Sequence, residues 1–205
     1  MEKETGRIEG FSDGVFAIAI TLLVLDLHAP EIGIVKTSSE LLTFLKSEWT
    51  TYLAFTLSFF SIFIMWVNHH KIFKQIYSRN TGIMFANGLI LFLVSAVSYP
   101  TALLARFFDG EASNIAVAVY TGIFVLINIS YNLLWFIASH NKKLLRPGIT
   151  DSAIKKITNN YLYGFPTYLI AFGISFKFPT IALAINMMLL IFWAVSSGKI
   201  KVAQE

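Results

Sequence analysis

The chain of 205 residues contains no cysteine. This absence excludes disulfides, thiolate metal ligands and cysteine nucleophiles. Charge is also scarce, because Asp, Glu, Lys and Arg make up only 14% of the chain, whereas soluble domains carry about a quarter. Hydrophobic residues make up 56%. The shortage of charge therefore predicts an integral membrane protein.

Several functional motifs are missing as well. The sequence has no Thr-Val-Gly-Tyr-Gly carbonyl filter, no arginine-rich voltage-sensor repeat, no phosphate-binding loop, no Gly-x-Ser-x-Gly elbow and no His-Glu-x-x-His. We therefore predict that the protein is not an enzyme and holds no cofactor. The formal charge of +4 does not indicate nucleic-acid binding, because the basic residues sit between apolar runs instead of clustering on one soluble face.

Six stretches are long and apolar enough to be membrane helices, which need about 20 mainly apolar residues. They cover about 10–27, 50–70, 82–105, 114–138, 158–176 and 178–197. Alternating ten-residue strands are absent, which disfavours a barrel. The first stretch is not typical of a signal peptide, because Asp13 lies inside it and no small-x-small cleavage site follows. We predict an all-α integral membrane protein, with residues 1–205 forming one six-helix domain.

The connections between these stretches predict the orientation. If the N-terminus is inside, twelve of the sixteen Lys and Arg residues lie on the inside and four on the outside. The four are Lys36, Lys46, Arg106 and Lys177. Cytoplasmic connections carry an excess of Lys and Arg, so both termini are predicted to be cytoplasmic. Pro100 is predicted to kink the third span, and the amphipathic piece at 41–45 to lie at the outer interface.

Polar residues meet at the predicted inner end of the first two spans. Asp13 lies near the inner end of the first span, and Trp66, Asn68 and His69 lie at the inner end of the second, followed by His70. One interpretation is a structural clamp between two helices, in which charges find partners where water is scarce. Another is a proton-sensing or proton-relaying site, because histidine titrates near neutral pH. The sequence leaves open which histidine pairs with Asp13.

Metal binding at this cluster is a weaker interpretation. Two adjacent histidines lack the i, i+4 spacing that brings ligands together on one helical face, so no metal site is predicted. Amides at membrane depth elsewhere are expected to make interhelical hydrogen bonds. These are Asn87, Asn128, Asn132 and Asn186.

The first span has two different faces. An apolar stripe is formed by Phe11, Ile18, Leu22 and Leu25. At about 100° per residue these four lie within roughly 40° of Ile18, whereas Ser12 and Asp13 lie more than about 110° away from it. We expect the polar pair to face the protein interior. Asp26 closes the span at its outer end, either as a solvated helix end or as a mouth that attracts cations.

Arg7-x-x-x-Phe11-Ser12-Asp13, placed before the first of six predicted spans, resembles the signature of the transmembrane protein 175 family. Its members are the potassium channels of lysosomes and of bacteria. Trp66-x-x-His69, at the end of the second span, extends the resemblance along the chain. A single six-helix unit is similar to the prokaryotic form, which implies the plasma membrane of a prokaryote.

The resemblance implies a homotetramer with one first helix per subunit around a central pore. It places the narrowest constriction at Ile18, further apolar rings at Leu22 and Leu25, and a hydroxyl layer linked to cation selectivity at Thr21. It also implies an interhelical network around the signature. The residues of that network are Arg7, Phe11, Ser12, Asp13, Trp66, Asn68 and His69.

The resulting hypothesis is a potassium-permeable cation channel, with potassium ions, the lipid bilayer and further copies of the chain as its partners. The apolar ring replaces a carbonyl filter and stops or passes ions. One alternative is a proton-coupled transporter or proton-conducting protein that uses Asp13 and His69. Another is a scaffold protein without transport. Paired repeats and broken helices, which are frequent in transporters, are absent from the sequence.

Overall fold

In the described part of the chain the protein is helical, apart from one isolated bridge between Ile76 and Leu145. The computed structural model describes residues 4–31, 33–140 and 142–199, with the backbone alone at 197–199. The prediction of an all-α protein is therefore confirmed. Lys3 and Lys201, which contributed to the predicted orientation, lie outside the described residues.

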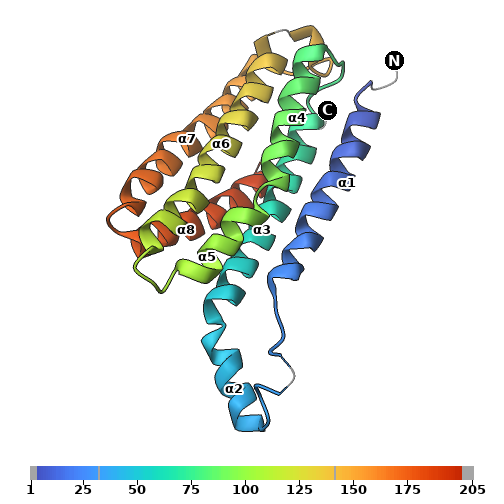
Figure 1. The fold of residues 1–205 in the computed structure, drawn as a ribbon. Helices are drawn as coiled ribbons and strands as arrows, with labels where there is room; N and C mark the ends of the chain where they lie inside the picture. Colours follow the sequence, from blue (N-terminus) through green and yellow to red (C-terminus); the bar gives the residue numbers. More distant parts are fainter. Residues whose placement is uncertain (1–3, 32, 141, 200–205) are drawn as a thin grey trace.

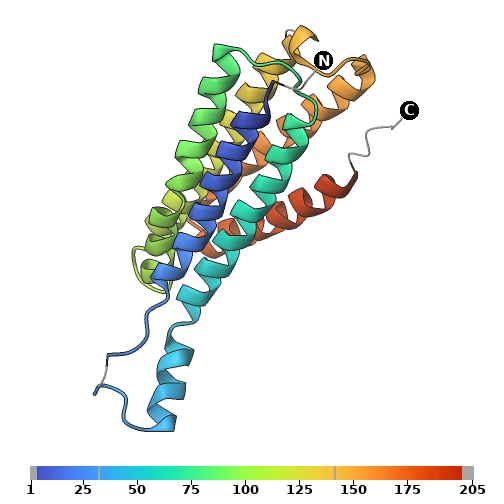
Figure 2. The same cartoon turned by 90° about the vertical axis from the view of Figure 1, so that its right-hand side faces the viewer.

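The helices form an elongated bundle in which successive long segments alternate in direction (Figure 1). In chain order the elements are α1 (Gly6–Leu22), the 3-10 turn η1 (Leu23–Asp26), α2 (Ser38–Ser47), α3 (Trp49–Phe73), α4 (Thr81–Ser95), α5 (Ser98–Phe107), α6 (Ser113–His140), the 3-10 turn η2 (Lys142–Leu144), α7 (Asp151–Ser175) and α8 (Pro179–Lys199). Helix α1 lies at one edge of the bundle, and α8 crosses it obliquely (Figures 1 and 2).

Five segments of the described chain are long and apolar enough to cross a membrane by length and composition. They are Gly6–Asp26, Trp49–Phe73, Thr81–Phe107, Ser113–His140 and Pro179–Ser196. The predicted span 158–176 corresponds to α7 (Asp151–Ser175), which is not among them. Helix α7 begins seven residues earlier than predicted, carries Lys155 and Lys156 in its second turn, and contains Pro166. The count of six membrane spans remains a prediction.

The third predicted span is two helices and not one kinked helix. Helix α4 ends at Ser95 and α5 begins at Ser98. Pro100 has no N–H to donate to the carbonyl of residue 96, so the regular helical ladder cannot continue through this point. Thr101 supports the start of α5, because both its N–H (3.1 Å) and its hydroxyl (2.8 Å) donate to the Val97 carbonyl.

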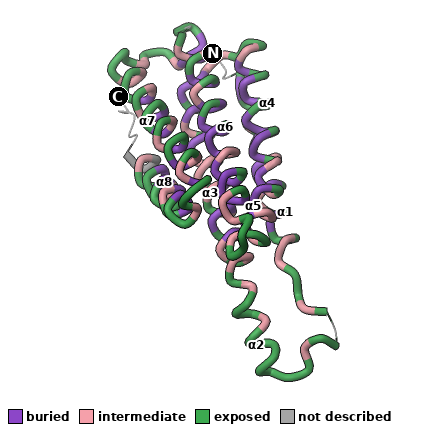
Figure 3. The backbone as a smooth tube through the Cα atoms, turned by 60° about the vertical axis from the view of Figure 1, so that its left-hand side comes forward, coloured by how far each residue is buried: buried purple, intermediate pink, exposed green. Residues whose placement is uncertain are grey.

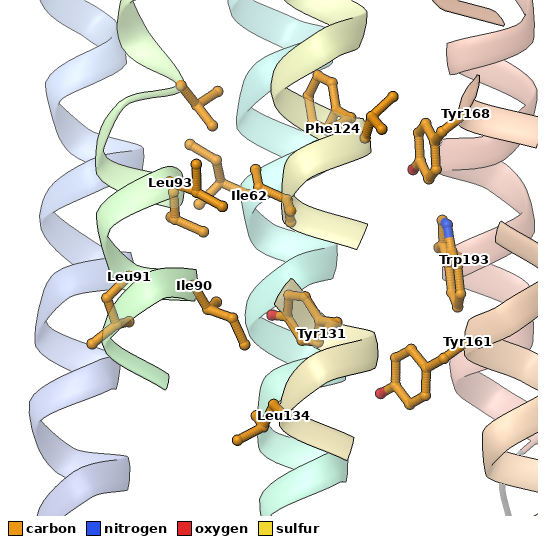
Figure 4. Close-up of a cluster of buried hydrophobic side chains, with 14 of the residues drawn as sticks. Ile62, Ile90, Leu91, Leu93, Phe124, Tyr131, Leu134, Tyr161, Tyr168 and Trp193 are labelled. Atoms are coloured by element: carbon orange, nitrogen blue, oxygen red, sulfur yellow. The ribbon is translucent and has the colours of Figure 1, made fainter. Parts of the chain in front are cut away.

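Buried side chains of α3, α4 and α6 meet in the hydrophobic core (Figure 4). Ile62 of α3, Ile90 of α4 and Leu134 of α6 are all fully buried there. Amides join helices at the periphery of this core. Asn186 of α8 donates to the Thr121 hydroxyl of α6 at 2.9 Å.

Asn132 of α6 likewise joins helices, because its Nδ2 donates to the Tyr161 carbonyl of α7 at 3.2 Å. Asn128 was predicted to bond a neighbouring helix, but its observed bond lies within α6. Its side-chain oxygen accepts from Asn132 of the same helix at 3.1 Å.

Backbone hydrogen bonds tie three segments together at the end of the bundle where α1 begins. The Tyr77 N–H donates to the Leu144 carbonyl at 2.8 Å, and the Arg146 N–H donates to the Gln75 carbonyl at 2.8 Å. The Glu4 N–H donates to the Tyr77 carbonyl at 3.1 Å. These bonds join the α3–α4 and α6–α7 connections to the segment before α1, and so fix the point at which α1 enters the bundle.

At the opposite end, α2 extends beyond the bundle (Figures 1 and 2). A capping box starts this helix, in which the Thr37 hydroxyl accepts from the Glu40 N–H and the Glu40 carboxylate accepts from the Thr37 N–H. None of its residues is buried, and most of the segment before it is exposed (Figure 3). Its placement at the outer membrane interface stays a prediction.

The packing of α3 predicts a difference between two identical substitutions. Ile62→Ala removes a fully buried side chain and should lower the free energy of unfolding by about 2–5 kcal/mol. Ile181→Ala removes a side chain that is 53% exposed on α8 and should cost less than about 1 kcal/mol. Denaturant titration of the purified protein in micelles measures both. Equal losses would contradict the assignment of the core.

Candidate functional site

Helix α1 has two different faces. One face packs against other helices, and the other is not covered by any described residue of the chain. The packed face consists of Ser12, Phe16 and Ala19, continued by Leu23 of η1, all of which are buried. Their spacing of four, three and four residues forms one helical stripe. This stripe lies against α3 and α4.

A chain of hydrogen bonds crosses from α1 to α4 and α3. The Asn87 Nδ2 of α4 donates to Ser12 Oγ at 3.0 Å, and Asn87 Oδ1 lies 2.7 Å from His69 Nε2 of α3. The Ser12 hydroxyl donates to the Ile8 carbonyl at 2.7 Å, so Ser12 can only accept from Asn87. The amide orientation follows, and with it the assignment of the histidine proton to Nε2.

Aromatic rings cover this hydrogen-bonded chain. The His69 ring is 1% exposed. Its centroid lies 5.3 Å from that of Phe16 on α1 and 4.5 Å from that of Phe73 on α3. Because the three side chains are buried, the Ser12–Asn87–His69 contacts have no competing partner, and they fix α1 laterally in its N-terminal half.

Asp13 has a different partner. The Trp66 Nε1–H of α3 donates to Asp13 Oδ1 at 2.8 Å. Asp13 is exposed and Trp66 half-buried, and the Trp66 ring stacks on His70 with centroids 6.5 Å apart. This second contact between α1 and α3 therefore lies at the surface of the chain, beside the buried one.

The structure thus separates residues that the sequence had grouped. His69 hydrogen-bonds Asn87, and within the described residues neither His69 nor His70 hydrogen-bonds Asp13. Arg7 is exposed and makes no side-chain hydrogen bond or ion pair with the described residues. Asn68 Nδ2 donates to the Ile64 carbonyl of its own helix at 2.9 Å.

Asn87 is the member of this site that sequence reasoning missed. It was expected to make an interhelical bond, but not to the signature serine. Its only signal is an amide inside the otherwise apolar α4, and topology cannot tell which neighbouring helix such an amide faces. Phe16 was missed for the same reason, because an aromatic residue in an apolar span gives no sign of its partner.

The uncovered face of α1 carries the residues expected to line a pore. Ile18 is 60% exposed, Leu22 48% and Leu25 68%. At Gly10 and Gly14, on the adjoining side of the helix, a built Cβ would meet nothing within 4 Å. No described part of the chain covers this face. Phe11, the signature aromatic residue, is likewise exposed.

Thr21 lies beside this apolar stripe and is exposed. Its hydroxyl lies 3.0 Å from both the Ala17 and the Ile18 carbonyl oxygens of the preceding turn, to which it donates. Because its single proton is used in the helix, the oxygen lone pairs face outward. The exposed hydroxyl can therefore act as an acceptor for a cation.

Asp26 lies at the C-terminal end of η1, half-buried at the edge of a cavity of about 400 Å³. The cavity is also lined by Glu31, Glu48 and Arg106, so acidic groups outnumber the basic one. Nδ1 of the His28 ring lies 2.9 Å from the Asp26 carbonyl oxygen.

Comparison with known proteins gives consistent matches. The sequence model of the family described as endosomal/lysosomal potassium channel TMEM175 matches residues 7–97. A protein of Chamaesiphon minutus named potassium channel is 44% identical over 96% of this chain and 97% of its own length. The human protein named endosomal/lysosomal proton channel TMEM175 is 30% identical over 70% of this chain, which corresponds to 30% of that protein.

A solved structure has the same fold. The crystal structure titled as a lysosomal potassium-selective channel TMEM175 homolog from Chamaesiphon minutus superposes with a TM-score of 0.83. It is 42% identical and covers 95% of this chain and 98% of that one.

The buried contact predicts a specific loss when Asn87 becomes Leu. The substitution keeps the side-chain volume but leaves the His69 N–H without its acceptor, which should cost about 1–3 kcal/mol. Asn159→Leu, at an exposed position of α7, is the matched control. Hydrogen exchange should show faster exchange of the α1 amides in the Asn87 variant alone. Equal exchange in both variants would mean that Asn87 does not hold α1.

Proposed function

The chain belongs to the family of the endosomal/lysosomal potassium channel TMEM175, and we propose that it is a potassium-permeable cation channel whose narrowest point is an apolar ring on α1. The observation that carries this proposal is the uncovered apolar face of α1, with Ile18 60% exposed. A helix fixed on one side and bare on the other is suited to line a pore shared by several copies.

The proposed constriction is formed by Ile18, with further apolar rings at Leu22 and Leu25. A ring of branched aliphatic side chains is too narrow for a hydrated ion and dewets when closed, so ions pass only when the ring widens. Potassium holds its hydration shell less tightly than sodium and passes more readily. Thr21, whose oxygen faces outward, supplies an acceptor layer beside the ring.

The hydrogen bonds of Ser12, Asn87 and His69 support a fixed inner end for α1. With that end held, widening of the ring is expected to come from displacement of the outer part of the helix, which continues into the exposed segment after Asp26. The signature residues then act as positioning groups. They do not contact the permeating ion in this proposal.

Charge at the outer end supports cation entry. The end of the bundle that carries α2 has six acidic residues against four basic ones. The acidic residues are Asp26, Glu31, Glu40, Glu48, Asp109 and Glu111, and the basic ones are Lys36, Lys46, Arg106 and Lys177. Negative potential at a mouth raises the local cation concentration. Asp26 lies closest to the α1 ring along the chain.

The proposed assembly is a homotetramer in the plasma membrane of a prokaryote, with one α1 per subunit around the pore. Six membrane-crossing segments with both termini cytoplasmic complete this proposal. The excess of Lys and Arg at the end where α1 begins supports that orientation. Arg7, exposed at the start of α1, is available to a neighbouring copy.

Proton conduction is the second candidate, favoured by the name of the human relative. It would use the same α1 pore. A proton-coupled transporter built on a paired Asp13 and His69 has less support, because these side chains have separate partners. Reconstituted liposomes containing a potassium indicator and a pH indicator separate the candidates. Potassium flux without proton flux supports the potassium channel, and proton flux without saturation supports proton conduction. Flux that depends on a pH gradient and saturates with substrate supports the transporter.

The proposed ring predicts that Ile18→Asn hydrates the constriction. Conductance should rise severalfold and the potassium-to-sodium permeability ratio should fall toward unity, as measured by bilayer recording of purified protein. Ile191→Asn places the same amide at a position of α8 that is 63% exposed and should change neither quantity. If Ile18→Asn leaves conductance and permeability ratio unchanged, Ile18 is not the constriction.

The positioning role of the signature predicts a different outcome for Asp13→Asn. Asparagine keeps an oxygen for the Trp66 N–H but loses the charge, so assembly and yield should fall while the ion preference of the remaining channels stays the same. Asp151→Asn, at the exposed start of α7, is the control. Light scattering after size exclusion gives the assembled fraction. A fully assembled variant with altered ion preference would refute this role.

A further inference from the structure

A cavity of about 60 Å³ lies inside the bundle between α3, α6, α7 and α8, and no residue of α1 lines it. Its walls combine aromatic rings with amide and hydroxyl groups, and none of its lining residues is Asp, Glu, Lys, Arg or His. Figure 4 shows Tyr161, Tyr168 and Trp193 opposite Phe124 and Tyr131. The proposed pore on α1 makes no use of this space.

Asn186, one of the residues that line the cavity, has an unpaired acceptor. Asn186 is 8% exposed, and its Nδ2 donates to the Thr121 hydroxyl and to the Ala182 carbonyl, both at 2.9 Å. The Ala182 carbonyl can only accept, so the orientation of the amide is fixed. Asn186 Oδ1 is buried and has no hydrogen-bond partner. Because burying an unpaired acceptor is unfavourable, a donor is needed to complete the site.

The cavity opens on one side only. Of its lining residues, Ser61, Ile64 and Met65 on α3 and Leu190 on α8 are partly exposed, and the others are buried. The entrance is therefore the seam between α3 and α8. Figure 2 shows α8 crossing the bundle obliquely, so that its C-terminal half diverges from α3. Both helices are apolar enough to span a membrane, so this seam is open to molecules dissolved in the bilayer.

Gly164 sets the shape of the cavity wall. A Cβ at this position would lie 2.5 Å from Trp193 Cζ2 and 2.8 Å from Asn128 Nδ2. Glycine thus allows α7 and α8 to approach until the Trp193 ring stacks on Tyr161, with centroids 5.9 Å apart. A larger residue would displace the Trp193 ring.

We propose that this cavity binds the uncharged polar end of a membrane-soluble amphiphile, an alcohol or a primary amide, whose O–H or N–H donates to Asn186 Oδ1. The lining offers no counter-charge, which excludes an ionised head group. The volume of about 60 Å³ is small, so only a small head enters. The apolar tail lies in the α3–α8 seam against Ile64 and Leu190.

The test uses 6-fluorohexan-1-ol and 1-fluorohexane, which differ in the hydroxyl group, with the full-length protein in nanodiscs. Fluorine NMR line broadening beyond that of empty nanodiscs reports binding to the protein. Broadening by the alcohol should saturate with concentration in the wild type. It should also saturate in Met188→Leu, a control at an exposed position of α8 outside the cavity. Broadening by 1-fluorohexane should match that of empty nanodiscs.

Two variants locate the binding. Asn186→Leu removes the acceptor and should weaken alcohol binding roughly fivefold, as expected for one hydrogen bond between uncharged groups. Gly164→Ala should weaken it by moving Trp193. No saturable broadening in the wild type would mean that the cavity holds water alone and would overturn the proposal. Equal binding of 1-fluorohexane by the wild type would overturn it too, and that comparison needs no variant to fold.

Discussion

The hydrogen-bonded contact between Ser12, Asn87 and His69 is the interaction on which the rest of this structure depends. In water, the apolar face of α1 would be enough to hold it against the bundle. In a bilayer it is not, because lipid tails are as apolar as the side chains of α3 and α4. The buried hydrogen bonds give α1 one preferred rotation about its axis. That rotation decides which side chains face the bundle and which remain uncovered.

The same contact explains how an apolar helix comes to have one buried and one uncovered face. Ser12, Phe16 and Leu23 are buried, while Ile18 and Leu25 on the other side are exposed. A rotation of α1 by half a turn would bury the aliphatic stripe and expose the serine. The signature polar residues therefore matter for what they orient, and the side chains proposed to meet ions are ordinary aliphatic residues that no motif would single out.

Sequence alone could predict the helical class, the family and the common level of Asp13 and Trp66 along the bundle, because these follow from composition, from the signature and from the order of the helices. It could not predict the direction in which each side chain points around its helix axis. Asp13 and His69 lie at similar depth, yet their side chains bond Trp66 and Asn87 respectively. Nor could it predict the division into α4 and α5, because a proline in a membrane helix is compatible with either a kink or a break. The early start of α7 was hidden by Lys155 and Lys156, which are typical of a loop between spans.

The 75 residues that separate Ser12 from Asn87 also determine the order of events during synthesis. Because the chain is made from its N-terminus, α1 is synthesised before α4. The Ser12 hydroxyl therefore enters the membrane without its amide partner. The bond from that hydroxyl to the Ile8 carbonyl lies within α1 itself and needs no other helix. Newly made α1 therefore satisfies the Ser12 hydroxyl within its own helix. It is free to rotate about its axis until Asn87 is inserted and fixes its orientation.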